Sequence, residues 1–482
     1  MISILRKKSF HKLFLTLFIF LTGCKPQAIQ TTLQLSQPES EFLSIEVDPS
    51  HTYQVIESFG VSGAWWAQEV GGWQADNRQK VIDLLFDPIK GIGLTLYRYN
   101  IGAGGGGEIQ DYWRKTEGFE IGPRIYDWRR DANATRILKM VHAAGIDQFV
   151  AFANSPPSRL TRSGMVSGSV DGESNLGLYQ EEEFAQYLVD IVRYLRQELG
   201  IPIGWISPIN EPQWEWNLSN GQEGCHYTPE ETAALVYALQ EAITKNGLEV
   251  KVLAPESAKW SGSQVYIDAL YQNFKLFSNL DQFAIHSYWS TPEEKEQLAG
   301  YVRETYPGVR LWMTEWTEMQ PGRDTGTQSA IVLARTIHED LTLGGVTSWQ
   351  YWIGVSKYDF HDGLIYIDQN IQKITETKRL WAMGNYSRFI RPGWKLILAK
   401  VTSPGLLVSA YTPPQGQSLV IVAINILPQS QEAILKINGP NWFHMSAYET
   451  SETKDLAQVA LGTLPERYSF PGNSVTTLVI QP

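Results

Sequence analysis

Two stretches of the chain each end an apolar run on a glutamate. In the first, WISPINEPQWEW beginning at Trp205, Glu211 follows the run and lies between Pro208 and Pro212. In the second, RLWMTEWTEM beginning at Arg310, Glu315 follows another run. Short apolar runs predict buried strands and proline ends a strand, so each carboxyl group is expected at a strand end. Two facing carboxyl groups are what glycoside cleavage requires, because one donates a proton while the other attacks or activates water.

The residues beside the two glutamates suit contact with a sugar. Asn210 can hydrogen-bond a hydroxyl group, and the indoles of Trp214 and Trp316 offer flat apolar faces. An Asn-Glu-Pro sequence is also common in turns, so the first stretch alone leaves that interpretation open. The second stretch favours the chemical interpretation, because a chance pair of such strand ends is much rarer than one alone.

The composition favours a neutral substrate. The net charge of -11 argues against nucleic acid and against an anionic membrane surface, since both need a basic face. The 17 Trp and 22 Tyr exceed what a core needs, and sugar-binding surfaces are one reason to expose aromatic residues. The 8 His have no paired spacing and no acidic calcium-binding loop is present, so we expect neither a metal nor another cofactor.

The N-terminus reads as a targeting segment. Residues 1–24 combine a basic start with an apolar stretch too short to span a bilayer, and they end in Leu-Thr-Gly before Cys24. This ending resembles a bacterial lipobox, in which the cysteine becomes lipidated; an ordinary signal peptide with an incidental cysteine is the alternative. We therefore expect a lipid-anchored protein of the bacterial cell envelope, periplasmic or at the cell surface. Only Cys225 remains in the mature chain, which excludes an intramolecular disulfide.

The main part of the chain reads as an α/β region. After a polar tether at 25–42, residues 58–385 alternate strand-like runs with helical patterns. The strand-like runs are 58–66, 93–102, 146–155, 203–210, 249–256, 280–288, 310–316 and 346–353. The helical patterns are 76–86, 132–144, 181–199, 229–246, 264–274, 293–305, 327–343 and 375–383. This order predicts a (β/α)₈ TIM barrel with its active site at the C-terminal strand ends, where Glu211 follows the fourth strand and Glu315 the seventh.

The last part of the chain, residues 386–482, predicts an attached β-sandwich. It lacks a long helical period and consists of short β-rich runs separated by Pro, Gly and Asn turns. These runs are 395–401, 406–411, 418–426, 431–437, 443–449 and 474–480. Residues 43–57 also read as strand, and we expect them to join the sandwich, so that both ends of the chain build this domain.

Several short motifs, in order along the chain, are similar to those of a known family. They are SFGVSGAWW from Ser58, RYNIG from Arg98, NSPP from Asn154, NEPQ from Asn210, HSYW from His286, TEW from Thr314 and PGNSVTT from Pro471. Together they resemble glycoside hydrolase family 30, which combines a (β/α)₈ barrel with a β-sandwich built from both chain ends. The resemblance covers essentially the whole mature chain.

The resemblance implies a role for particular residues. It makes Glu211 the general acid/base and Glu315 the nucleophile of a retaining, double-displacement hydrolase. Within the family, the pair Trp65-Trp66 and the QWEW after Pro212 look most like the endo-β-1,6-galactanase branch. Substrate contacts are expected from Trp65, Arg98, Asn100, Asn154, Asn210, Trp214, His286, Tyr288, Trp316 and Trp352. For the Arg, Asn and His residues of this set, a purely structural hydrogen bond is the alternative.

Other functions stay open at this point. The same barrel could carry an exo-acting β-glycosidase or a β-1,6-glucanase, and a surface glycan-binding protein could use the cleft without turnover. Glu215, Glu256 and Glu318 are rival carboxylates, but none is expected both at a strand end and opposite a partner. We expect a carbohydrate polymer as the partner, no nucleic acid, a membrane contact only through the lipid anchor, and a monomeric protein.

Overall fold

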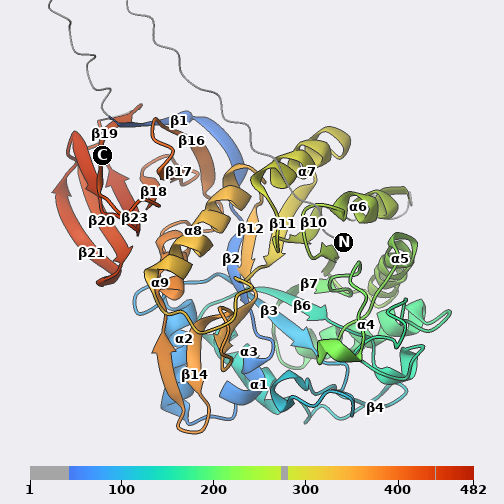
Figure 1. The fold of residues 1–482 in the computed structure, drawn as a ribbon. Coiled ribbons are helices and arrows are strands. Elements are labelled where there is room, and N and C mark those ends of the chain that lie inside the picture. The colour runs from blue at the N-terminus through green and yellow to red at the C-terminus, as the bar shows by residue number, and fades with distance from the viewer. Residues whose placement is uncertain (1–42, 273–279, 440) are drawn as a thin grey trace, which may run out of the picture. The chain divides into compact units, whose positions relative to one another are not determined.

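The computed structural model describes residues 43–272, 280–439 and 441–482 (Figure 1). The signal peptide, Cys24 and the tether predicted for 1–42 lie outside these residues, as does the end of the helix predicted at 264–274. Within the described ranges, no helix combines the length and the hydropathy needed to cross a membrane.

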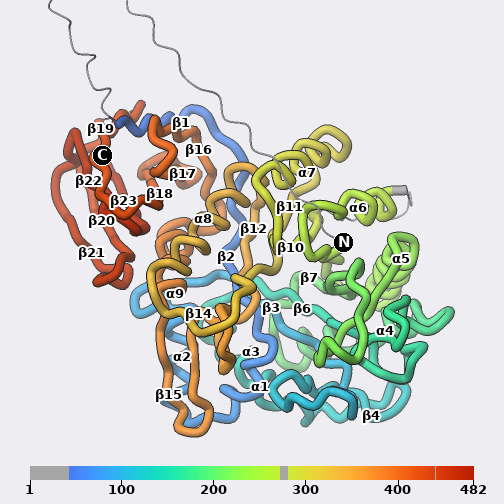
Figure 2. The backbone as a smooth tube through the Cα atoms, viewed as in Figure 1, coloured from blue at the N-terminus to red at the C-terminus, as the bar shows by residue number. Residues whose placement is uncertain are grey.

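The α/β region forms a closed barrel of parallel strands (Figures 1 and 2). Its sheet has nine described strands in the order β8-β7-β6-β3-β2-β12-β11-β10-β9. Only Leu253 separates β8 from β9, and its N–H donates to the carbonyl of Ile206 at 2.9 Å, so these two act as one strand and the ring closes. The strands are β2 (Ser58–Ser62), β3 (Leu96–Ile101), β6 (Gln148–Ala153), β7 (Ile203–Ser207), β8 (Lys251–Val252), β9 (Ala254–Ser257), β10 (Gln282–His286), β11 (Arg310–Glu315) and β12 (Ser348–Tyr351). The predicted (β/α)₈ barrel is confirmed.

Helices connect these strands and surround the barrel (Figure 1). They are α1 (Trp66–Val70), α2 (Ala75–Phe86), α3 (Ala132–Ala143), α4 (Glu181–Gln197), α5 (Pro229–Lys245), α6 (Ser263–Gln272), α7 (Pro292–Thr305), α8 (Thr327–Thr342) and α9 (Lys378–Ser387). Their apolar faces explain this placement: in α4, Phe184, Leu188 and Val192 are fully buried, and the acidic first turn suits a helix N-terminus. α5 and α7 each begin with a Thr-Pro pair and a capping box.

The last helix begins later than its pattern predicts. The first two residues of the predicted helix belong instead to strand β15 (Lys373–Glu376). This strand pairs antiparallel with β14 (Gly363–Asp368), which pairs in parallel with β13 (Ile353–Ser356). The side chain of Thr377 then caps α9, which starts at Lys378 rather than at 375. Strand pairing and a cap residue outweigh the helical period here, because the pattern at 375–383 spans only about two and a half turns. A short hairpin after β3 consists of β4 (Glu120–Gly122) and β5 (Ile125–Tyr126).

The β-rich region forms a second nine-stranded sheet of described residues, in the order β21-β20-β23-β18-β17-β16-β1-β19-β22. β1 lies between β16, to which it is antiparallel, and β19, to which it is parallel; it is the blue strand among red ones in Figure 1. Phe470 of β22 and Ala447 of β20 share one hydrophobic core although their strands lie far apart in this order, so the sheet folds back on itself as a sandwich. The strands are β1 (Ser44–Val55), β16 (Lys395–Val401), β17 (Leu406–Thr412), β18 (Leu419–Asn425), β19 (Gln431–Ile437), β20 (His444–Ser451), β21 (Lys454–Thr463), β22 (Arg467–Phe470) and β23 (Ser474–Gln481).

The sequence pattern does not predict β21 and β22. These two strands lie at the opposite ends of the sheet order. Most side chains of β21 are exposed or half-buried, so the strand has little need of the alternating apolar residues that reveal inner strands.

Candidate active site

The two glutamates meet at the C-terminal mouth of the barrel. Glu315 is the last residue of β11, and Glu211 lies beyond the end of β7 in a left-handed conformation with φ 48°. The N–H of Glu211 donates to the carbonyl of Glu256 at 2.9 Å and so fixes this turn. One carboxylate oxygen of each catalytic candidate and one ring nitrogen of His286 lie within 4.8 Å of one another. Two stretches far apart in sequence therefore place their carboxyl groups side by side.

Arg98 links the two glutamate-bearing strand ends. This fully buried side chain donates from Nη1 to Glu315 Oε2 at 2.6 Å and from Nη2 to Asn210 Oδ1 at 3.2 Å. Its Nη2 also lies 3.5 Å from Glu256 Oε1, and its guanidinium carbon lies 3.6 Å from the ring centre of Phe152. Short charge-assisted bonds of this kind orient a carboxylate strongly.

Both oxygens of the Glu315 carboxylate accept hydrogen bonds. Tyr288 donates its hydroxyl to Oε1 at 3.2 Å, and Arg98 donates to Oε2. Burial raises the pKa of Glu315 above its ordinary value, while the positive charges of His286 and Arg98 oppose that rise. The nearby Glu211 adds to the rise in this pKa. The ionisation of Glu315 therefore depends on the two cations beside it.

A buried histidine joins Glu211 to a third glutamate. His286 Nδ1 lies 3.2 Å from Glu211 Oε1, and Nε2 lies 3.1 Å from Glu256 Oε2. Burial lowers the pKa of His286, but the surrounding carboxylates, Glu315 foremost, outweigh burial and raise it to about 9. Burial likewise raises the pKa of Glu256, but Arg98 and His286 outweigh it and lower this pKa to about 2. The imidazole is therefore a cation at neutral pH and donates from both nitrogens.

Glu256 supports the site and is not positioned to act on a substrate. It is fully buried, it is not among the residues that line the cavity, and it accepts hydrogen bonds from Ser207 at 2.8 Å and from Thr314. The sequence offers it only as a rival carboxylate, because nothing in the local pattern shows that its partners are Arg98 and His286. We refer to Arg98, Glu256, His286 and Tyr288 as the floor of the site.

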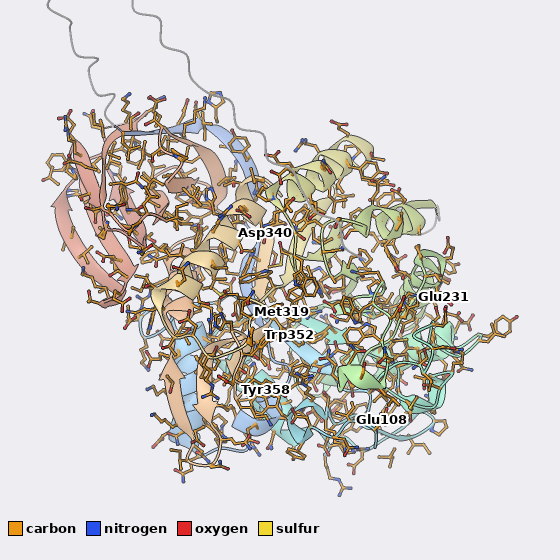
Figure 3. All side chains as sticks on the ribbon, viewed as in Figure 1. Glu108, Glu231, Met319, Asp340, Trp352 and Tyr358 are labelled. Atoms are coloured by element: carbon orange, nitrogen blue, oxygen red, sulfur yellow. The ribbon has the colours of Figure 1, made fainter. Side chains whose placement is uncertain are left out.

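A cavity of about 190 Å³ exposes the two glutamates. Its lining includes, from the predicted contact residues, Asn210, Trp214, Tyr288 and Trp352. Trp289 and Met319 also line it and are missed by the sequence reasoning; Figure 3 labels Met319 next to Trp352. Trp214 and Trp289 are stacked, with ring centroids 6.0 Å apart and an angle of 19° between the rings. We refer to Trp214, Trp289 and Met319, which are 43%, 59% and 43% exposed, as the rim.

The ring of Trp65 is covered by other side chains, so it offers no open face on which a sugar could stack. It is buried, its ring meets Trp352 edge-on with centroids 5.2 Å apart, and the guanidinium of Arg114 lies 5.0 Å from its ring centre. Arg114 also donates to the hydroxyl of Tyr358 at 3.2 Å and to the carbonyl of Asn220 at 3.3 Å. Three loops therefore meet at Arg114. No strand-end signal in the sequence could have found Arg114, because it ends a short 3₁₀ helix (Tyr112–Arg114) away from the strand ends.

Three other predicted contact residues are buried outside the cavity lining. Asn100 has structural partners, the main chain at 3.3 Å and Thr116 at 3.4 Å. Trp316 packs on the aromatic side chains of β12, with centroid distances of 6.2 Å. Asn154 is 2% exposed, and neither polar atom of its side chain has a hydrogen-bond partner among the described residues. A buried amide without partners costs free energy, so Asn154 is the one of the three that stays available to a ligand.

Glu211, His286 and Glu315 are also close enough to offer one atom each to a metal ion. A metal needs a neutral imidazole, whereas the carboxylates around His286 hold it as a cation. Arg98 already places a positive charge 2.6 Å from Glu315. The cluster therefore fits proton transfer better than metal binding.

Comparison with known proteins decides the family. The sequence model of the protein family described as O-Glycosyl hydrolase family 30 matches residues 42–366 of this chain. The chain belongs to glycoside hydrolase family 30. It is an O-glycosyl hydrolase, and the family predicted from the short motifs is confirmed.

Relatives in this family differ in the polymer they are named for. An endo-beta-1,6-galactanase of Hypocrea rufa is 23% identical over 412 residues, which are 79% of this chain and 81% of that protein. The glucuronoxylanase XynC of Bacillus subtilis (strain 168) is 25% identical over 347 residues, which are 69% of this chain and 74% of that protein. A solved structure, a conserved exported protein from Bacteroides fragilis, has a TM-score of 0.81 and 28% identity, covering 90% of this chain and 100% of that chain. Family membership therefore leaves the substrate open.

Proposed function

We propose that this protein is a retaining endo-β-1,6-galactanase. The observation that carries the retaining mechanism is that one oxygen of Glu211 and one of Glu315 lie within 4.8 Å of each other. Retaining glycosidases hold their carboxyl groups about 5–5.5 Å apart, whereas inverting ones leave roughly 6.5–9.5 Å for a water molecule. The aromatic cavity and the galactanase relative support the choice of substrate.

Glu315 is the nucleophile of the proposed first step. Arg98 and Tyr288 hold its two oxygens, and Nδ1 of His286 lies 3.7 Å from Oε1. These contacts favour the ionised carboxylate, against the rise in pKa that burial causes. Attack on the anomeric carbon forms a glycosyl ester with Glu315 and breaks the bond to the leaving oxygen.

Glu211 is the acid of the first step and the base of the second. Its side chain lines the cavity, and protonated His286 donates to its Oε1, which leaves Oε2 for the proton that passes to the leaving oxygen. In the second step Glu211 takes a proton from a water molecule that attacks the ester. Two inversions at the same carbon release the sugar with its configuration retained.

The proposed substrate is a neutral galactan rather than a uronate-bearing xylan. A uronate needs a cation within reach, yet the cavity lining in the described part of the chain contains no Lys or Arg. Arg98 is buried and already bound to carboxylates. The net charge of -11 also disfavours anionic polymers. Attack within the chain is supported by the exposed rim, which offers contact area beyond the catalytic pair.

The test is a product profile on β-1,6-galacto-oligosaccharides of increasing length. We expect cleavage to become faster with length, with galactobiose and longer products early and a first-formed product of retained configuration by NMR. Release of single galactose units alone would indicate an exo-acting enzyme, and equal activity on β-1,6-glucan would indicate a glucanase. Binding without any hydrolysis would indicate a glycan-binding protein.

We also propose that Cys24 anchors the mature protein to a membrane of a bacterial cell envelope. The support is the basic start, the short apolar stretch and the small residues before the cysteine. Cell fractionation of Cys24→Ala should move the protein from the membrane to the soluble fraction. An unchanged membrane pool would contradict the anchor.

A further inference from the structure

A buried ion pair joins the helices α7 and α8. Asp340 of α8 is fully buried, and Lys295 of α7, which is 1% exposed, places its Nζ 3.0 Å from Asp340 Oδ1. Figure 3 labels Asp340 apart from Met319 and Trp352, which line the cavity, and Asp340 is not among the lining residues. A buried ion pair adds little stability over apolar side chains of the same size, so folding gives little reason for this one.

The carboxylate of Asp340 also accepts hydrogen bonds from two neighbours. Ser287 donates from Oγ to its Oδ1 at 2.8 Å, and Trp349 donates from Nε1 to its Oδ2 at 2.8 Å. The indole Nε1 of Trp260 lies 3.0 Å from Ser287 Oγ. An indole N–H can only donate, so the hydroxyl of Ser287 accepts there and gives its own proton to Asp340. The carboxylate therefore fixes the direction of the Ser287 side chain.

Ser287 lies between two residues of the floor. On one side of it His286 contacts Glu211, and on the other Tyr288 donates to Glu315. Successive side chains of an extended segment point to opposite faces, so the first and third of these residues face the catalytic pair while the middle one faces α8. The hydroxyl of Ser287 is thus the connection between the helices outside the barrel and the two floor residues.

The backbone pairing of this segment is irregular. The register between β10 and β11 shifts between Ile285 and His286. Beyond the shift, the N–H of Ser287 donates to the carbonyl of Glu315 at 3.3 Å, which is longer than an ordinary bond of a strand ladder. Strand pairing therefore holds this segment less firmly where the floor residues begin, and the side-chain bond of Ser287 adds a constraint there.

We propose that Asp340 is a positioning residue of this active site, which orients His286 and Tyr288 through the hydroxyl of Ser287. The inference rests on the proposed catalytic roles of the two glutamates. Lys295 lets Asp340 remain an ionised acceptor, because the ammonium group offsets the cost of burying its charge. A change in this connection should therefore alter turnover and its pH dependence, and not the affinity for the substrate.

The test measures nitrophenol release from 4-nitrophenyl β-1,6-galactobioside by Ser287→Ala, which removes the connection and leaves the ion pair. We expect kcat to fall about five- to tenfold, as for one lost hydrogen bond, with KM changed by less than about twofold. The alkaline limb of kcat/KM should move to lower pH, because the bonds from His286 to Glu211 and Glu256 help to raise the pKa of the imidazole to about 9.

Two further variants complete the comparison, and thermal unfolding is measured for each. Asp340→Asn should lower kcat by roughly 100-fold, because it disturbs the whole network and misplaces the floor. Ser387→Ala is the matched control: Ser387 is also buried and donates from Oγ to the carbonyl of Ile92 at 2.6 Å, but in the described part of the chain it has no hydrogen bond to the floor. Its Tm should fall as in Ser287→Ala, while kcat, KM and the pH profile stay those of the unaltered protein.

The outcomes separate this inference from the proposed function. If Ser287→Ala keeps the kcat or the pH profile of the unaltered protein, or if Ser387→Ala lowers kcat equally, the positioning role is wrong and the hydrolase stands. No nitrophenol release by the unaltered protein would overturn the proposed galactanase. NMR titration of His286 then tests the positioning role without turnover, and a pKa that is the same in Ser287→Ala would overturn it.

Discussion

The floor and the rim of the site are built in opposite ways. In the floor, Arg98, Glu256 and His286 are fully buried, and Glu256 contacts both cations. In the rim, Trp214 and Trp289 are 43% and 59% exposed and stack on each other. Both parts border the same pair of glutamates. They differ in burial and in charge, and not in their distance from the catalytic residues.

The difference follows from what each part must do. A buried charge is costly unless partners surround it, so the groups that set protonation must be oriented before a substrate arrives. A surface that binds sugar must leave its apolar faces uncovered until the sugar covers them. We therefore expect substitutions in the floor to change turnover and its pH dependence, and substitutions in the rim to change affinity and length dependence.

The largest effect should come from the two glutamates that the floor holds. Glu315→Ala should lower kcat by at least about 10⁴-fold, because no glycosyl ester can form. Glu211→Ala should lose less on aryl galactosides, whose good leaving groups need little protonation, than on oligosaccharides. Steady-state kinetics on both substrate types would measure this difference.

Azide distinguishes the two roles and serves as the control. In Glu315→Ala, azide can occupy the vacated face and give an α-glycosyl azide. In Glu211→Ala, azide attacks the ester on Glu315 and gives a β-glycosyl azide. The opposite pairing of products by NMR would reverse the assignment of acid/base and nucleophile.

The next effect concerns Glu256, a floor residue that is not among those lining the cavity. Glu256→Gln keeps the shape and removes a negative charge that helps to raise the pKa of His286 to about 9. The imidazolium should then lose its proton at lower pH, so the alkaline limb of kcat/KM should move to lower pH and kcat should fall about 10- to 100-fold. Glu215→Gln, an exposed neighbour of the site, is the control and should keep the profile of the unaltered protein. If neither limb of the pH profile of kcat/KM moves in Glu256→Gln, Glu256 acts only through packing.

A smaller effect is expected for Tyr288, which donates one neutral hydrogen bond to Glu315. Burial already raises the pKa of Glu315 above its ordinary value, so activity should be lost as pH falls through that raised pKa. Tyr288→Phe removes a donor to the ionised form, which should raise this pKa further and lower kcat/KM by roughly tenfold at neutral pH. The acid limb of the pH profile is the measurement, and a limb that moves to lower pH would contradict the contact.

The smallest effect should come from the rim. Trp214→Ala should raise KM by about two- to tenfold on long galacto-oligosaccharides, and less on the shortest cleavable one, because only longer chains cover the indole. KM plotted against chain length is the measurement. A lower kcat with an unchanged KM at every length would place Trp214 with the floor rather than with the rim.

The fold and the catalytic pair could be predicted from the sequence because both follow from local patterns of apolar and polar residues. The runs that end at Glu211 and Glu315 are short, apolar and bounded by proline or polar residues, and counting alternating elements placed them after the fourth and seventh strands. In a closed barrel such strand ends share one mouth, so their proximity follows from the count. The helix predicted from 375 begins instead at Lys378, because the pairing of β15 and the cap at Thr377 depend on neighbours that a local helical period does not contain.

Only the tertiary structure decided which side chains face the cavity. Glu256 and Glu315 both come from strand ends, yet one is sealed beside Arg98 and the other lines the cavity. Trp65 and Trp289 are both indoles at strand ends, yet Arg114 covers the first and the second is exposed in a left-handed turn. Spacing along a strand tells where a residue lies, but the direction of a loop side chain depends on contacts with loops that are distant in sequence. For that reason the sequence predicts the chemistry of this site, but it does not predict the division of the site into floor and rim.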